Sequence, residues 1–185
     1  MNPVRRKILL VGVSCVGKTT IGRLLAGRLG LPFFDLGEEI ERYFETSIER
    51  LQSRLLTGYS YRKETAVVLK HILAENDNCV IALAPSGLRD AYLRVIKTVD
   101  CVTVAIDDKP ENILQRITFY DIDSRLIEKR LTPKEKNFYL EDIRKDINFF
   151  KRSYRRADLH ADINGLDAQA GAEKIAGLLA PFVER

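Results

Sequence analysis

One stretch near the start of the chain carries residues whose types and spacing suit phosphate binding. Residues 12–19 read Gly-Val-Ser-Cys-Val-Gly-Lys-Thr and fit the phosphate-loop (P-loop, Walker A) pattern Gly-x-x-x-x-Gly-Lys-Ser/Thr. Glycines let the backbone turn tightly, so that successive N–H groups can point at phosphate oxygens. The residues expected to hold ATP here are Gly12, Ser14, Cys15, Val16, Gly17, Lys18, Thr19 and Thr20.

Within this loop, two side chains have chemistry of their own. Lys18 can reach the β- and γ-phosphates, and the Thr19 hydroxyl can ligate Mg²⁺. The apolar run at residues 8–11 predicts a buried strand before the loop, and a helix beginning near Lys18 would add the positive end of its dipole. A chance match in a glycine-containing turn would require neither flanking element, so the context favours a nucleotide site.

Composition narrows the class of protein. The length of 185 residues predicts one domain over 1–185. The net charge is +4, and the basic residues are scattered among acidic ones rather than clustered as in nucleic-acid-binding surfaces. The basic start leads into only about six apolar residues before Gly12, too few for a signal peptide or membrane span. Three widely spaced cysteines favour the reducing cytoplasm, with buried thiols at Cys79 and Cys101. We expect a monomer or weak homodimer.

Strand and helix patterns alternate along the chain, which predicts an α/β fold with a parallel sheet covered by helices on both faces. The expected strands are 8–11, 32–35, 80–84, 101–106 and 159–163, and the expected later helices are 37–44, 48–56, 61–74, 88–97, 111–119, 139–157 and 168–182. Ligands bind such sheets at the carboxyl ends of the strands. The phosphate loop, Asp35, the turn 85–87 and the segment after Ile106 should therefore meet at one edge.

Residues 120–137 break the alternation, because they are charged and weakly periodic. Their basic residues include Arg125, Lys129 and Arg130. A solvated loop is one interpretation. The other is a mobile lid over phosphates, which would order when nucleotide and acceptor bind.

Beyond the loop, further motifs resemble the shikimate kinase family, a group of small P-loop kinases related in fold to nucleoside monophosphate kinases. The similar stretches are 17–26, 31–35, 38–41, 46–48, 61–62 and 154–158. The resemblance implies a three-layer fold with a five-stranded parallel sheet and a mobile lid. It also implies a kinase that uses ATP and Mg²⁺ to phosphorylate a small hydroxylated, anionic acceptor.

The resemblance further implies roles for single residues. Asp35 matches the first acid of an Asp-x-Asp motif that helps to hold both Mg²⁺ and substrate, so Thr19 and Asp35 are the expected metal residues. Lys18, Asp35 and Arg125 are the expected catalytic residues, with Arg125 as the lid arginine that reaches the transferring phosphate. A further match, Arg116, takes the position of an arginine that lies against adenine.

On the acceptor side, the family pattern is only partly kept. Arg62 matches an arginine that binds the substrate carboxylate, and Gly87 is the one glycine of a segment where the family has three. By contrast, Gly37 replaces the second acid of Asp-x-Asp, and Leu126 replaces a lid proline. We therefore expect shikimate to be a poor acceptor, because a positioned acid is missing.

Several alternatives stay open. Glu38 or Glu41 could replace the missing acid, and the second carboxylate-binding arginine could be Arg152, Arg155 or neither. A nucleotide-binding regulatory protein without transfer activity is a second function. A GTPase-type switch is a third, but the sequence has no Asn-Lys-x-Asp guanine motif. We expect ATP to be preferred over GTP.

Overall fold

The structure, a computed structural model, describes residues 7–183, so the basic residues Arg5 and Arg6 lie outside the described part. Within residues 7–183 the chain forms seven strands: β1 (Lys7–Val11), β2 (Phe33–Asp35), β3 (Cys79–Ala82), β4 (Val102–Asp107), β5 (Phe119–Tyr120), β6 (Leu126–Ile127) and β7 (Leu159–Asp162). The helices are α1 (Lys18–Leu29), α2 (Leu36–Phe44), α3 (Ile48–Ser53), α4 (Gly58–Glu75), α5 (Asp90–Ile96), α6 (Pro110–Gln115), α7 (Pro133–Tyr154) and α8 (Ala168–Val183).

The predicted five-stranded parallel sheet is confirmed. Its order is β2-β3-β1-β4-β7, and every neighbouring pair is parallel. The strands β1 and β4 are almost wholly buried apolar runs, as expected for central strands covered on both faces. Because the strands are parallel, the phosphate loop after β1 and Asp35 at the end of β2 lie at the same edge.

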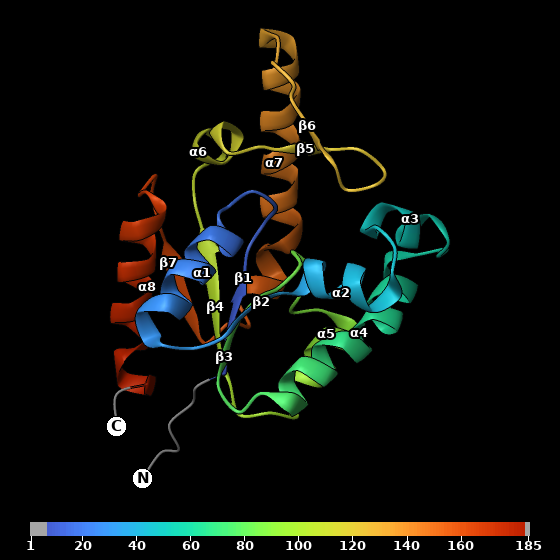
Figure 1. Ribbon diagram of the computed structural model, residues 1–185. Coiled ribbons are helices and arrows are strands. Elements are labelled where there is room, and N and C mark those ends of the chain that lie inside the picture. The colour runs from blue at the N-terminus through green and yellow to red at the C-terminus, as the bar shows by residue number, and fades with distance from the viewer. Residues whose placement is uncertain (1–6, 184–185) are drawn as a thin grey trace.

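Helices cover both faces of the sheet. Helices α1 and α8 pack together on one side, while α4 and α5 pack together on the other (Figure 1). The close approach of α1 to the sheet requires Gly22, because a Cβ there would lie 2.6 Å from the Phe33 ring. Gly30 ends α1 in the left-handed conformation (φ 65°), as its position after an apolar-faced helix predicts.

The largest departure from expectation is in residues 120–137. Instead of a single irregular segment, β5 and β6 form an antiparallel hairpin, and α7 begins at Pro133, six residues before the predicted start. The early start has a local cause. Thr132 and Glu135 form a capping box, and Pro133 occupies the first helical position, where a missing N–H costs nothing.

Several other boundaries differ from the prediction, and two of them have a clear local cause. Helix α6 ends at Gln115 rather than at 119, because Phe119 joins the hairpin as part of β5. Helix α4 begins at Gly58 rather than at 61, since the Thr57 hydroxyl accepts the Ser60 N–H as an N-cap.

The predicted burial of two cysteine thiols is confirmed. The thiols of Cys79 and Cys101 are buried, and burial raises the pKa of the Cys79 thiol to about 11. Within residues 7–183, every helix is too short or too polar to cross a bilayer.

Candidate active site

The phosphate loop turns tightly between β1 and α1. A Cβ on Gly12 would lie 2.6 Å from the Ile106 carbonyl oxygen, so only glycine fits there. Gly17 is the N-cap of α1 at φ 110°, and Cys15 is also left-handed at φ 59°. Since Gly17 has no side chain to cap the helix, the first-turn N–H groups are left for an anion.

The Lys18 side chain bends back onto the phosphate loop. Its Nζ donates hydrogen bonds of 2.9 Å to the carbonyl oxygens of Gly12 and Val13. Desolvation lowers the Lys18 pKa to about 8, although the charge of Asp35 acts to raise it. A polyphosphate would offer this ammonium a stronger partner than two carbonyl groups.

The Thr19 hydroxyl and the Asp35 carboxylate meet across the loop. Thr19 Oγ1 donates to Asp35 Oδ2 at 2.6 Å. The other oxygen, Oδ1, accepts the Gly37 N–H at 2.9 Å as the N-cap of α2. Asp35 thus caps a helix and faces the phosphate loop at the same time, and the two functions do not exclude each other.

Arg116 closes the other side of the loop. Its guanidinium donates to the carboxylate of Asp108 at 2.7 Å and to the Val16 carbonyl at 3.4 Å. Asp108 has a fully buried side chain. It also accepts bonds from Asn112 and from the backbone N–H of Gly165. Asp108 is a site residue beyond those predicted from the sequence, and its position directly after β4, at the ligand edge, is the signal that could have identified it.

We predict that Asp108 makes the protein sensitive to acid. Burial alone would raise the Asp108 pKa, but hydrogen bonds from Asn112, Arg116 and the backbone of Lys109 and Gly165 outweigh it and lower the pKa. Because the folded-state pKa lies below the unfolded value of about 4, the carboxylate stabilises the fold above that pH. This contribution is lost as the pH falls through the folded-state pKa.

The variant Asp108→Asn should lower the free energy of unfolding by about 1–3 kcal/mol at pH 7, as measured by urea denaturation. The difference from wild type should shrink as the pH falls below about 4. Asp77→Asn, at an exposed position, is the matched control. Equal stability of the Asp108 variant and wild type at pH 7 would contradict the assignment.

The phosphate loop opens into a cavity of about 730 Å³, within the usual range for small-molecule sites. It extends from the nucleotide side to α2, α3 and the hairpin. Its lining consists of Cys15, Gly17, Lys18, Thr19, Thr20, Asp35, Gly37, Glu38, Glu41, Ile48, Glu49, Arg116, Thr118, Tyr120 and Ser124. The cavity therefore brings together most of the predicted nucleotide and metal residues.

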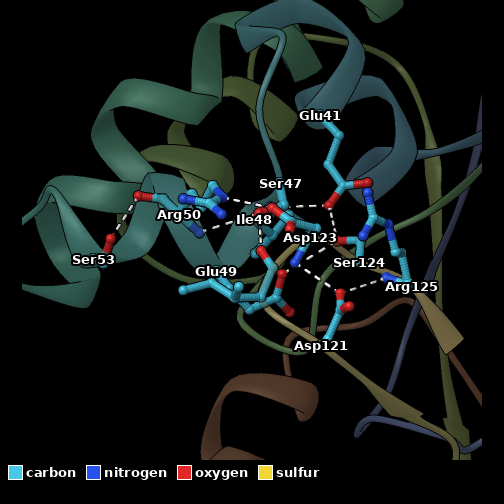
Figure 2. A network of polar contacts seen from close by, with 11 residues as sticks. Glu41, Ser47, Ile48, Glu49, Arg50, Ser53, Asp121, Asp123, Ser124 and Arg125 are labelled. Atoms are coloured by element: carbon cyan, nitrogen blue, oxygen red, sulfur yellow. Dashed lines mark hydrogen bonds and ion pairs between the residues drawn. The ribbon is translucent and has the colours of Figure 1, made fainter. Parts of the chain in front are cut away.

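The turn of the β5–β6 hairpin is bound to α3 and to the end of α2 (Figure 2). The Arg50 Nε donates to Asp123 at 2.6 Å, and the Ser47 hydroxyl donates to the Ile122 carbonyl. The Ser124 hydroxyl donates to Glu41 and also, at 3.2 Å, to Glu49. The hairpin thus covers the end of the cavity that lies away from the phosphate loop.

We expect the Arg50–Asp123 ion pair to hold this hairpin weakly. Both side chains are more than a third exposed, and such pairs contribute at most about 1 kcal/mol. In Arg50→Ala, amide hydrogen exchange in residues 119–127 should become measurably faster, by up to about fivefold. Arg54→Ala, at the end of the same helix, is the control, and equal exchange in both variants would contradict the role of the pair.

Several residues predicted to bind the acceptor or the transferring phosphate do not belong to the cavity lining that the described residues form. Arg62 is held by Asp90, and Gly87 is buried, where a Cβ would lie 2.6 Å from Leu83 Cβ. Arg125 is exposed, and its backbone N–H donates to Asp121. Arg152 and Arg155 are exposed on and after the last turn of α7, away from the lining.

The two candidate replacements for the missing acid both line the cavity, but each already has partners. Glu38 forms a 2.6 Å ion pair with Arg23. Glu41 accepts the backbone N–H of Ile48 at 2.9 Å and the Ser124 hydroxyl. Because these bonds hold the start of α3 and the hairpin, Glu41 has a structural function whether or not it contacts the acceptor.

Comparisons with known proteins agree with this geometry. The family model described as shikimate kinase matches residues 14–176. Shikimate kinase from Aquifex aeolicus is 32% identical over 154 residues, covering 83% of this chain and 84% of that protein.

Solved structures give the same result. Shikimate kinase from Acinetobacter baumannii, solved in complex with shikimate, has a TM-score of 0.72 and 26% identity, covering 98% of this chain and 96% of that chain. Shikimate kinase from Bacteroides thetaiotaomicron has a TM-score of 0.76 over 94% of this chain and 97% of that chain, and its 22% identity supports the fold alone.

A P-loop between β1 and α1, with the Thr19 hydroxyl and the Asp35 carboxylate beside it at one edge of a five-stranded parallel sheet, is typical of P-loop nucleotide-binding proteins. Within that class, the chain belongs to the shikimate kinase family, whose model matches most of its length. It is an ATP-dependent kinase with an alcohol acceptor, and this membership argues against the GTPase-type switch.

Proposed function

We propose that this protein transfers the γ-phosphoryl group of ATP to a hydroxyl group of shikimate. The observation that carries the proposal is the pairing of Thr19 with Asp35 in a cavity that runs from the phosphate loop to α3. An acceptor in the far half of this cavity would lie next to the transferring phosphate. The acceptor oxygen would attack the γ-phosphorus, ADP would leave, and the hydroxyl proton would pass to Asp35 or to water.

Each part of the loop has a proposed role. Residues 12–20 would hold the triphosphate through backbone N–H groups, and Lys18 would exchange its two carbonyl partners for phosphate oxygens. Arg116 would lie against the adenine, fixed in place by Asp108. Arg125 would have to move from its exposed position to reach the phosphate, as expected of a residue on a lid.

The residues present fit Mg²⁺. This ion prefers oxygen ligands and keeps several waters, and the Thr19 hydroxyl and Asp35 carboxylate supply two adjacent oxygen donors. Bound there, Mg²⁺ would neutralise charge on the β- and γ-phosphates. Asp35 would keep the bond that its Oδ1 accepts from the Gly37 N–H, so α2 would remain capped.

Calorimetric titration with ATP and GTP tests the nucleotide half of the proposal. We expect ATP to bind more tightly, and equal or tighter binding of GTP would contradict the placement of Arg116.

A panel of cyclic polyols and hydroxy acids, with shikimate included, tests the acceptor half through release of ADP. We further expect a monomer or weak homodimer acting in the cytoplasm, where thiols stay reduced.

A further inference from the structure

Arg62, which corresponds to the carboxylate-binding arginine of the family, already has a carboxylate partner. Its Nε donates to Asp90 Oδ2 at 2.8 Å, and its Nη2 lies 2.6 Å from the same oxygen. The Arg62 side chain is 13% exposed and that of Asp90 33%. An ion pair this far buried is screened much less by solvent than a surface pair.

The backbone supports this pairing at some cost. Asp90 is the first residue of α5 and has φ 48°, in the left-handed region that few residues other than glycine, asparagine and aspartate adopt. Helices α4 and α5 pack against each other, which brings Asp90 opposite the second turn of α4. The packing of two helices therefore fixes the carboxylate beside the guanidinium.

We propose that Asp90 is a specificity-determining residue that occupies Arg62 and so weakens the binding of acceptors with a carboxylate. This inference rests on the proposed function, in which shikimate is the acceptor. A shikimate carboxylate would have to replace Asp90 or share the arginine with it. One ion pair would be exchanged for another, so the acceptor would gain little from the residue that should anchor it.

The consequence is a weakness in binding rather than in chemistry. While Arg62 is paired with Asp90 it is absent from the lining of the cavity that holds Lys18, Thr19 and Asp35, so it would have to leave Asp90 to meet the carboxylate of an acceptor there. Changing Asp90 should therefore alter the KM for shikimate and leave kcat and ATP affinity unchanged. A residue that only stabilised the fold would not produce this separation.

Asp90→Asn tests the proposal because it removes the charge and keeps the size of the side chain. Calorimetry should show shikimate binding about tenfold more tightly or better than to wild type, the gain expected from a charge-assisted hydrogen bond. The methyl ester of shikimate, which has no carboxylate, should gain nothing. Adding Arg62→Met to the same chain should abolish the gain, and Asp77→Asn should change nothing.

Unchanged or weaker shikimate binding in Asp90→Asn would overturn the proposal, as would an equal gain for the methyl ester. If Asp90→Asn fails to fold, Asp90→Gly replaces it, since glycine adopts φ 48° without strain. Binding is measured without turnover, so the two proposals can fail separately. Tighter binding without phosphoryl transfer would uphold Asp90 and refute the function, whereas transfer with unaltered binding would do the reverse.

Discussion

Gly37→Asp is expected to raise kcat/KM for shikimate by about 10²–10⁴-fold, the usual contribution of a positioned acid or base. Gly37 lines the cavity two residues after Asp35. A carboxylate there could accept a hydrogen bond from the acceptor hydroxyl and orient it for attack. The wild-type protein, which has no side chain at this position, should remain below roughly 10⁴ M⁻¹s⁻¹.

The backbone can accept this substitution. A Cβ on Gly37 would lie 3.1 Å from Asp35 Oδ1 and 3.2 Å from Ile48 Cδ1, so both neighbours need to move by only a few tenths of an ångström. Gly37→Asn is the matched control, because it has the same size without a basic carboxylate. Equal kinetics for the two variants, measured at saturating ATP, would show that the missing acid is not what limits the reaction.

Lys18→Met should lower kcat/KM by at least about 10²–10³-fold, because it removes a preorganised cation from the transferring phosphate. The same variant should unfold at no lower urea concentration than wild type at pH 7. Desolvation lowers the Lys18 pKa to about 8 in the folded state. Below that pH the lysine is charged in both the folded and the unfolded state, so the full cost of burying its charge destabilises the fold at pH 7. Loss of activity accompanied by loss of stability would contradict this assignment.

The lowered pKa also predicts how ATP binding depends on pH. In the free protein Lys18 loses its proton above about pH 8, whereas bound phosphates favour the charged form. ATP affinity should therefore fall as the pH rises past 8, and binding should take up a proton there. Calorimetry in two buffers with different ionisation enthalpies measures the uptake, which Lys18→Met should abolish.

The fold could be predicted from sequence because its signals are local. Apolar runs marked the central strands β1 and β4, and Gly30 marked the end of α1. The hairpin gave no such signal. Its two strands have only two residues each, and three of those four residues are exposed.

In the candidate site, too, some residues could be predicted from local sequence signals and others could not. The phosphate loop and Asp35 were identified because their chemistry follows from one motif and one strand end. The ion pair between Arg62 and Asp90 could not be predicted from the sequence, since Asp90 lies 28 residues away on another helix. A motif match gives a residue its type and position, but only tertiary packing decides which group it contacts.

Phosphorus NMR of the purified protein with ATP, Mg²⁺ and shikimate directly tests whether this protein transfers a phosphoryl group from ATP to shikimate. ADP and a phosphate monoester of shikimate should appear in equal amounts, slowly with wild type and faster with Gly37→Asp. With Lys18→Met both signals should appear at least about 10²-fold more slowly than with wild type. Absence of the ester with both wild type and Gly37→Asp, under conditions where ATP binds, would contradict phosphoryl transfer to shikimate and favour a nucleotide-binding protein without this activity.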